Sequence, residues 1–196
     1  MRIILIRHAQ SFGNKNDIIQ GQSNSNLSQE GKWQARKIAL RLKRRKIDII
    51  YSSDLERAKE TAKIIKKFHK KTKSHTLKIL RERNFGSLEG KSAKEFDIVK
   101  LRYRRPKGGE AQSEVKKRAE DFLKYLIKKY SKEAILVVTH GGIMRMVYSL
   151  LKKKSINQSY QDLPSGSVKN TSLFEIKLLA NKKFKIVKQK CTRHLV

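Results

Sequence analysis

Short apolar runs alternate with longer amphipathic stretches along this chain. Four of the runs fall at 2–7, 47–53, 76–80 and 134–140. Each is shorter than an ordinary helix, and its continuous apolar character is typical of a strand that is buried on both faces. Near the end of the chain, 171–179 and 183–190 are predicted to be two further strands, joined as a hairpin by "ANK" at 180–182.

The stretches between the runs carry apolar residues at helical spacing. Ser28 is a suitable N-cap for a first helix, and Ser53 with Glu56 has the spacing of a capping box for a second. A long helix is predicted over about 110–130, and another begins at the glycine pair 141–142. The residues predicted to face the core are Ala35, Ile38, Ala39 and Leu42 in the first helix, Leu55, Ala58, Ala62 and Ile65 in the second, Val115, Ala119, Phe122 and Leu126 in the third, and in addition Trp33.

Strands that alternate with helices predict an α/β fold whose sheet is mostly parallel. The length of 196 residues fits one domain with a full core. We therefore expect a single domain over 1–196, with three layers (α/β/α) and a mostly parallel central sheet. The stretch 81–109 is rich in loop-forming residues, and its part from about 84 to 109 is predicted to shape the substrate side of the site.

Polar side chains follow the four apolar runs at the carboxyl ends of strands, where open α/β sheets bind their ligands. Arg7 and His8 end the first run, and Arg57 lies one turn into the helix that follows the second. Glu82 comes after the third run, and His140 ends the fourth. The fold predicted above therefore brings these polar groups to one rim of the sheet.

The residue types at this rim suit a phosphate group. Arg7 and Arg57 offer planar, bidentate donors, which match phosphate oxygens. Asn14 adds a neutral donor from the following loop, and the backbone N–H groups of a helix that starts at Gly141 favour an anion. Two histidines at the same rim supply a candidate nucleophile.

A metal site is the alternative chemistry for the same rim. His8, His140 and Glu82 would supply two imidazoles and a carboxylate, a set known from catalytic zinc sites. Two neighbouring arginines would repel a divalent cation, however, and the chain has no H-E-x-x-H spacing. We expect a phosphate site with no metal and no cofactor.

The chain has 48 lysines and arginines against 17 aspartates and glutamates, a formal net charge of +31. Such a charge arises in proteins that bind nucleic acid or another polyanion, but it also arises from compositional bias. A nucleic-acid binder concentrates its charge, whereas lysine here is spread over most segments in short runs that are typical of solvated faces. We therefore expect a small phosphorylated substrate, attracted by the positive field, and no nucleic-acid partner.

Further features of the sequence concern the protein's surroundings. Cys191 is the only cysteine, so an internal disulfide cannot form, which fits a reducing compartment. No apolar run approaches the roughly 20 residues of a membrane helix, and the first residues do not resemble a signal peptide. We expect a cytoplasmic protein without a membrane partner, and the sequence carries no signal for its oligomeric state. His69, His75 and His194 lie outside any motif and are predicted to be surface residues.

Four motifs follow one another along the chain: "RHAQS", "SSDLERAKETA", "LRERNFGSLEG" and "VTHGG". In order and spacing they resemble the histidine phosphatase superfamily, in the branch that includes cofactor-dependent phosphoglycerate mutase and related phosphatases. The resemblance covers residues 2 to about 175. Two departures stand out, because Ala9 replaces the usual glycine and "SNSN" at 23–26 replaces a stretch that usually contains aspartate.

The resemblance implies a role for each rim residue. His8 would be the nucleophile that becomes phosphohistidine, and Glu82 would give and take the proton. Cations that face Glu82 would favour its ionised form, so we expect Arg81 and Arg83 to point away from the pocket. The implied ligands of the phosphoryl oxygens are Arg7, Arg57 and His140, with Asn14 assisting.

Three functions are compatible with these features. A metal-independent phosphomonoesterase (phosphatase) is favoured, because only 91–107 fill a gap in which family mutases tend to have a longer insertion. A cofactor-dependent phosphoglycerate mutase is the first alternative, because Arg102, Arg104 and Arg105 lie where mutases hold a substrate carboxylate. The second alternative is a non-catalytic basic module that binds polyanions, but binding alone does not require the acid Glu82.

Overall fold

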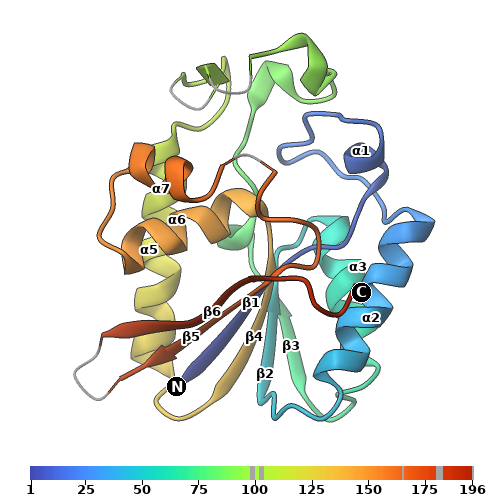
Figure 1. Ribbon diagram of the computed structural model, residues 1–196, viewed down its shortest axis with the longest axis vertical. Coiled ribbons are helices and arrows are strands. Elements are labelled where there is room, and N and C mark those ends of the chain that lie inside the picture. The colour runs from blue at the N-terminus through green and yellow to red at the C-terminus, as the bar shows by residue number, and fades with distance from the viewer. Residues whose placement is uncertain (98–99, 102–103, 165, 180–182, 196) are drawn as a thin grey trace.

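Six strands form one sheet in the part of the chain that this computed structural model describes, residues 1–97, 100–101, 104–164, 166–179 and 183–195 (Figure 1). The strands are β1 (Arg2–Arg7), β2 (Ile49–Ser52), β3 (Lys73–Thr76), β4 (Ala134–Thr139), β5 (Leu173–Leu178) and β6 (Phe184–Cys191). Their order is β3-β2-β4-β1-β5-β6. Strands β1 to β4 are mutually parallel, whereas β5 is antiparallel to β1 and β6 is antiparallel to β5. The predicted α/β fold with a mostly parallel central sheet is confirmed.

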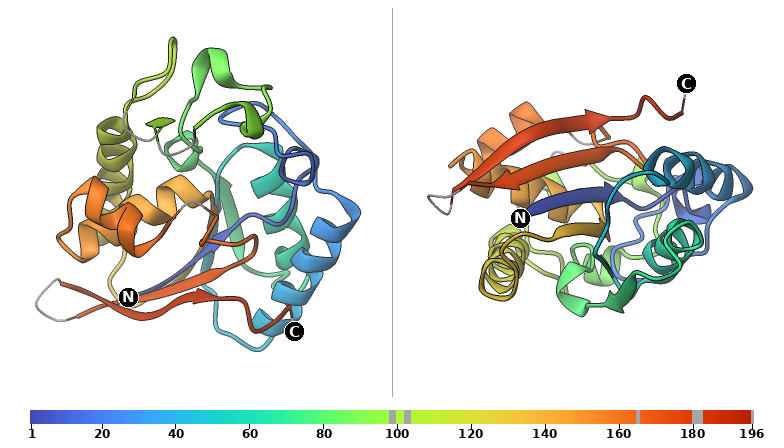
Figure 2. Two further views of the ribbon diagram at one scale, coloured as in Figure 1. Left: turned by 45° about the horizontal axis from the view of Figure 1, so that its top comes forward. Right: turned by 90° about the horizontal axis from the view of Figure 1, so that it is seen from below.

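Helices cover both faces of the sheet (Figure 2). The helices α2 (Gln29–Leu42) and α3 (Glu56–Lys66) lie on one face, and α5 (Gln112–Lys129), α6 (Gly141–Leu151) and α7 (Ile156–Asp162) lie on the other. Successive side chains of a strand point to opposite faces. In β1, Ile4 and Ile6 therefore belong to the core under α2 and α3, while Ile3 and Leu5 belong to the core under α5 and α6.

The irregular parts of the chain gather above the carboxyl ends of the parallel strands (Figure 1). They include α1 (Phe12–Lys15) and the short 3₁₀ turns η1 (Lys78–Leu80), η2 (Gly86–Leu88) and η3 (Ala93–Glu95). Strands β1 and β4 stay in register up to the pair Arg7 and Thr139. The N–H of His8 then donates to the carbonyl of Thr139 at 2.8 Å, which places His8 beside His140.

The residues of the first three helices that were predicted to face the core are all buried except Trp33, and one predicted helix start is wrong. Ser28 caps α2 as expected, because its Oγ accepts from the N–H of Gly31 at 2.9 Å. The capping box expected at Ser53 and Glu56 does not form, since the N-cap of α3 is Leu55 and has no side-chain cap. The buried Ser53 hydroxyl instead accepts from the Leu55 N–H at 3.3 Å, so it stabilises the turn between strand and helix.

The third predicted strand, 76–80, is wrong. The strand β3 covers Lys73–Thr76 at the edge of the sheet, with all four residues exposed, and η1 occupies most of the predicted range. An exposed edge strand requires no apolar residues, so "KSHT" carries no strand signal. The apolar character of "TLKIL" is explained by the 3₁₀ turn, because this turn buries Leu80 in the same core as the inward residues of α5 and α6.

Two predictions about single residues are also wrong. Trp33 is 43% exposed and lies under the ammonium group of Lys37, 4.9 Å from its ring centre, so it is not a core residue. His194 was expected at the surface but is only 8% exposed. His75 is exposed as predicted, and His69 is half-buried.

Two helices of the structure had no signal in the sequence, and one predicted turn lies outside the described residues. The helices α1 and α7 were not predicted, because "FGNK" and "INQSYQD" lack a repeating apolar face. The antiparallel pairing of β5 with β6 is confirmed, while the connecting residues 180–182 lie outside the described residues. None of the described helices combines the length and the apolar character needed to cross a membrane.

Candidate active site

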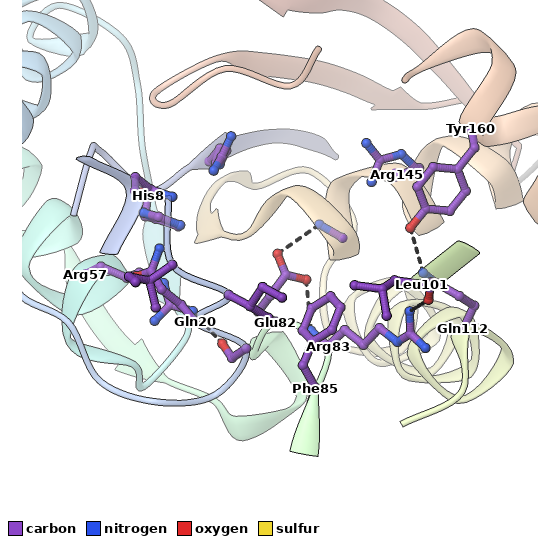
Figure 3. Close-up of a pocket in the computed structure, with 16 residues that line it drawn as sticks. His8, Gln20, Arg57, Glu82, Arg83, Phe85, Leu101, Gln112, Arg145 and Tyr160 are labelled. Atoms are coloured by element: carbon purple, nitrogen blue, oxygen red, sulfur yellow. Dashed lines mark hydrogen bonds between the residues drawn. The ribbon is translucent and has the colours of Figure 1, made fainter. Parts of the chain in front are cut away.

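Residues predicted at three of the four strand ends line one pocket (Figure 3). His140, at the fourth strand end, lies beside His8 but is not part of the described lining. Arg7 and His8 come from the end of β1, Arg57 from the first turn of α3, and Glu82 from the segment after η1. Asn14, from α1, also lines the pocket. His8 and Arg57 lie at one end of the pocket, with Glu82 towards its middle.

His8 has one ring nitrogen available for chemistry. Its side chain is almost completely buried, and Nδ1 lies 2.7 Å from the carbonyl oxygen of Ala9. A carbonyl oxygen only accepts, so Nδ1 carries the proton and Nε2 keeps its lone pair. Burial, and then the charges of Arg57 and Arg7, hold the pKa of His8 well below its usual value of 6.5. The imidazole is therefore neutral at neutral pH, as a nucleophile must be.

Buried donors without a protein partner surround this imidazole. The Arg7 guanidinium donates to the carbonyl of Val168 at 2.6 Å, and Arg57 donates to the carbonyls of Gly21 and Ser23 at 2.6 and 2.8 Å. The Nε atoms of both arginines have no hydrogen-bond partner among the described residues. Buried N–H groups are normally satisfied, so these donors indicate a site for a ligand with acceptor oxygens.

His140 belongs to the same group of donors. Its ring centre is 5.0 Å from that of His8, it is fully buried, and neither ring nitrogen has a partner in the described structure. Burial, followed by the charge of Arg57, holds the pKa of His140 well below 6.5. Burial also lowers the pKa of Arg57 to about 10, which still leaves a cation at neutral pH. Together these groups offer positive charge and several N–H donors to one anion.

The carboxylate of Glu82 is held by two backbone N–H groups. Oε1 accepts from Arg83 at 2.8 Å, and Oε2 accepts from Gly142 at 3.1 Å, in the first turn of α6. A Cβ on Gly142 would lie 2.1 Å from Glu82 Oε1, so the approach requires glycine at this position. Of the two glycines, it is Gly142 that lines the pocket, and the N-terminus of α6 binds the Glu82 carboxylate. Gly141, the predicted phosphate ligand, lies beside the Arg7 side chain.

Asn14 is oriented by hydrogen bonds to its amide oxygen. Oδ1 accepts from the N–H of Ser11 and from Nδ2 of Asn170, both at 3.2 Å. The Nδ2 group of Asn14 is therefore left as the donor that this pocket-lining residue offers a ligand.

The expectation for the two arginines beside Glu82 is wrong for one of them. Arg81 pairs with Asp54, with N···O distances of 2.8 and 2.6 Å. Arg83 is buried and lines the pocket. It donates to the carbonyls of Glu110 and Leu101, both at 2.9 Å, so its guanidinium holds the wall of the pocket and is not directed at the Glu82 carboxylate.

The pocket has a second end that the sequence did not predict. Arg145 and Tyr160 lie there with Gln112, on the far side of Glu82 from His8 (Figure 3). The Arg145 guanidinium is 4.2 Å from the centre of the Tyr160 ring. Tyr160 lies in the unpredicted α7, which explains why no signal pointed to it. The further lining residues are Ile18, Ile19, Gln20, Gly21, Phe85 and Leu101.

Two of the three basic residues that favoured a mutase lie in the described part of the chain, and neither lines the pocket. Arg102 is outside the described residues, and Arg104 is exposed. Arg105 donates to the carbonyl of Gly109 at 3.0 Å and to Glu114 at 3.3 Å. Neither Arg104 nor Arg105 belongs to the described lining of the pocket. The described part of the chain also contains no group of three or more histidine, cysteine, aspartate or glutamate side chains placed to hold a metal ion.

Comparison with known proteins shows which family the chain belongs to. The sequence model of the histidine phosphatase superfamily (branch 1) matches residues 3–192. The chain belongs to this superfamily. A metal-independent phosphoserine phosphatase of Arabidopsis thaliana is 36% identical over 165 residues, which are 78% of this chain and 69% of that protein. A phosphoglycerate mutase-like protein 4 of the same plant is 35% identical over 158 residues, or 74% of this chain and 69% of that protein.

The fold recurs in solved structures. YhfR of Bacillus stearothermophilus superposes with a TM-score of 0.90 at 23% identity, and the match covers 100% of this chain and 99% of that chain. The predictions of a histidine phosphatase fold and of a phosphatase within this superfamily are confirmed. The roles of individual residues remain predictions.

Proposed function

We propose that this histidine phosphatase is a metal-independent phosphomonoesterase that transfers a phosphoryl group from a small anionic ester to His8 and then to water. One observation carries the proposal. A neutral imidazole with a free Nε2 lies beside buried, unpartnered donor groups of Arg7, Arg57 and His140. A nucleophile that is enclosed by cationic donors suits a phosphoryl group, whose transition state spreads negative charge over its oxygens.

The proposed reaction has two steps. In the first, His8 Nε2 forms a bond to phosphorus while the bond from phosphorus to the ester oxygen breaks, and protonated Glu82 gives its proton to the leaving oxygen. In the second, the Glu82 carboxylate takes a proton from water, whose oxygen attacks phosphorus and releases phosphate from His8. Arg7, Arg57 and His140 hold the phosphoryl oxygens in both steps, with Asn14 as a neutral donor.

We also propose phosphoserine as the first substrate to examine, because the Arabidopsis relative is named as a phosphoserine phosphatase. The segment 84–109 contributes Phe85 and Leu101 to the pocket, which supports its proposed part in shaping the substrate side. A cytoplasmic location is proposed on the single cysteine, Cys191, which suits a reducing compartment.

The proposal is tested by measuring inorganic phosphate released in EDTA from phosphoserine, 3-phosphoglycerate and p-nitrophenyl phosphate. We expect the native protein to release phosphate from at least one of them. His8→Ala should be slower by on the order of a thousandfold or more, because removal of a covalent nucleophile costs at least that much. Activity that requires added zinc, or equal rates for the two proteins, would overturn it.

Phosphoglycerate mutase activity is the second candidate, because of the mutase-like relative at 35% identity. The product separates the two functions. A phosphatase releases phosphate from 3-phosphoglycerate, whereas a mutase forms 2-phosphoglycerate faster than phosphate appears.

A further inference from the structure

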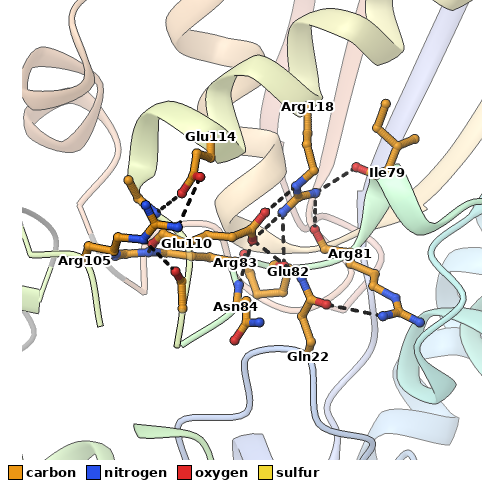
Figure 4. Close-up of polar contacts among 12 residues, drawn as sticks. Gln22, Ile79, Arg81, Glu82, Arg83, Asn84, Arg105, Glu110, Glu114 and Arg118 are labelled. Carbon is orange, nitrogen blue, oxygen red and sulfur yellow. Dashed lines mark hydrogen bonds and ion pairs between the residues drawn. The ribbon is translucent and has the colours of Figure 1, made fainter. Parts of the chain in front are cut away.

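The segment that carries Glu82 has no regular secondary structure to hold it. Residues 81–85 belong to neither a helix nor a strand. Their backbone N–H and C=O groups therefore need partners outside a helical or strand ladder. Arg118 on α5 and Glu110 just before it bind the carbonyls of Arg81, Glu82 and Asn84 and the N–H of Asn84 (Figure 4).

Arg118 uses all of its hydrogen-bonding capacity in this cluster. A guanidinium has five N–H donors. Two of them go to Glu110, with Nε donating to Oε1 at 2.8 Å and Nη2 to Oε2 at 2.9 Å. The other three go to the backbone carbonyls of Ile79, Arg81 and Glu82 at 2.8, 3.0 and 3.2 Å.

Glu110 fixes the other side of the same segment. Its Oε2 accepts from the N–H of Asn84 at 2.8 Å, and its own N–H donates to the carbonyl of Asn84 at 2.9 Å. Burial would raise the pKa of Glu110, but the hydrogen bonds from Arg118 and the Asn84 N–H, together with the charges of Arg118 and Arg83, outweigh it and the pKa is lowered. The pair is thus ionised at neutral pH, with 20% of each side chain exposed.

Neither member of the pair belongs to the described lining of the pocket. Their contacts bracket Glu82, because they hold carbonyls at 79, 81 and 82 and both backbone groups of Asn84. The carboxylate then needs only the N–H groups of Arg83 and Gly142 to complete its orientation. We propose that the Arg118–Glu110 pair positions the backbone of Glu82, so that its carboxyl group reaches the oxygen of the leaving group.

This proposal rests on the proposed function and makes a specific kinetic prediction. An acid assists the departure of a poor leaving group, whereas p-nitrophenolate leaves with little help. Loss of the pair should therefore lower kcat/KM for phenyl phosphate more than kcat/KM for p-nitrophenyl phosphate. The two esters have similar shapes, so a defect that is merely structural would lower both values equally.

The experiment compares native protein with Arg118→Met, Glu110→Gln and, as a reference, Glu82→Gln. We expect Glu82→Gln to be selective for the poor leaving group. Arg118→Met should show the same pattern, with a loss for phenyl phosphate about tenfold larger than for p-nitrophenyl phosphate. Arg118→Lys should recover part of this difference, because an ammonium group can donate three of the five bonds.

Lys117→Met is the matched control. Lys117 is the neighbouring residue on α5, and it forms an exposed ion pair with Asp121 at 3.1 Å. Its loss should leave both rates within about twofold of native, since exposed pairs contribute little to stability. Thermal unfolding of every variant shows whether it is folded. If Arg118→Met does not fold, Glu110→Gln takes its place, because it keeps the size of the side chain and one acceptor oxygen.

The outcomes separate this proposal from the proposed function. Equal losses for both esters in the folded variants would overturn the positioning role while His8-dependent hydrolysis stands. An inactive native protein would instead contradict the proposed function. Selective loss for phenyl phosphate in Arg118→Met or Glu110→Gln, without loss in Lys117→Met, supports the positioning role.

Discussion

The position of the Glu82 carboxylate depends on its close contact with Gly142, where there is no room for a methyl side chain. The Gly142 N–H donates to its Oε2 at 3.1 Å, and a Cβ at Gly142 would come within 2.1 Å of its Oε1. A separation of that size cannot persist, so either the carboxylate or the start of α6 has to move.

Gly142→Ala is therefore predicted to displace the acid. A displacement of about 1 Å at a reacting group costs on the order of 100-fold in rate, and we expect kcat/KM for phenyl phosphate to fall by about that factor. Gly141→Ala is the comparison, because its added Cβ would meet no atom closer than 3.8 Å. Similar losses in both variants would show that the contact with Glu82 does not explain the requirement for glycine.

The sequence predicted the groups of the pocket that lie at strand ends. His8, Arg57 and Glu82 line the pocket and His140 lies beside His8, because a parallel sheet brings its carboxyl ends to one rim. The orientation of Arg83 was not predictable, because it depends on carbonyls at 101 and 110 that are distant in sequence. It was likewise not predictable that Gly142, and not Gly141, lines the pocket, because this depends on where Glu82 lies.

Among the elements, the tail after β6 shows how a segment can couple stability to pH. Its His194 packs near α2, where Arg41 lies 3.1 Å from Nδ1, and Nε2 is 2.9 Å from the hydroxyl of Thr171. An arginine only donates, so Nδ1 accepts and the neutral ring carries its proton on Nε2. Burial, followed by the charge of Arg41, lowers the pKa of His194 from 6.5 to about 4.

The sign of the effect follows from proton binding. Between pH 6.5 and about 4 the unfolded chain binds a proton at His194 that the folded chain does not. The stabilisation is therefore fully present above pH 6.5 and is lost as the pH falls towards about 4. We predict that the Tm of native protein falls more between pH 7 and pH 5 than the Tm of His194→Gln. If the Tm values of the two proteins, measured by circular dichroism, changed with pH in parallel, this assignment would be contradicted. The other buried histidines are present in both proteins, so they do not contribute to the difference.

The elements that were mispredicted share a physical cause. A strand or helix shows itself in the sequence when it buries one face. The edge strand β3 buries none of its residues, so "KSHT" carries no signal and the pattern favours the neighbouring apolar run instead. The short α7 buries Ser159 and Tyr160, too few for a visible period. By contrast β1, β4 and α5 bury full faces, and the sequence predicted them within a few residues.

The whole molecule carries a net charge of +31, which opposes folding and attracts anions. Like charges repel one another in the compact state, and salt screens them over about 10 Å at 0.1 M. We predict that sodium chloride raised from about 20 to about 300 mM increases the Tm and lowers kcat/KM for an anionic ester. A Tm that falls with salt would contradict net self-repulsion, and a kcat/KM that does not change would contradict attraction of substrate by the overall field.

His8 Nε2 is the atom that is proposed to take the phosphoryl group, and both steps of the proposed reaction depend on it. The most direct measurement is a single turnover in EDTA with p-nitrophenyl phosphate labelled at phosphorus, quenched in alkali, in which phosphohistidine survives. We predict label on native protein that is stable in alkali and lost in acid, and no label on His8→Ala. Label on His8→Ala, or hydrolysis by that variant at the native rate, would contradict the central claim.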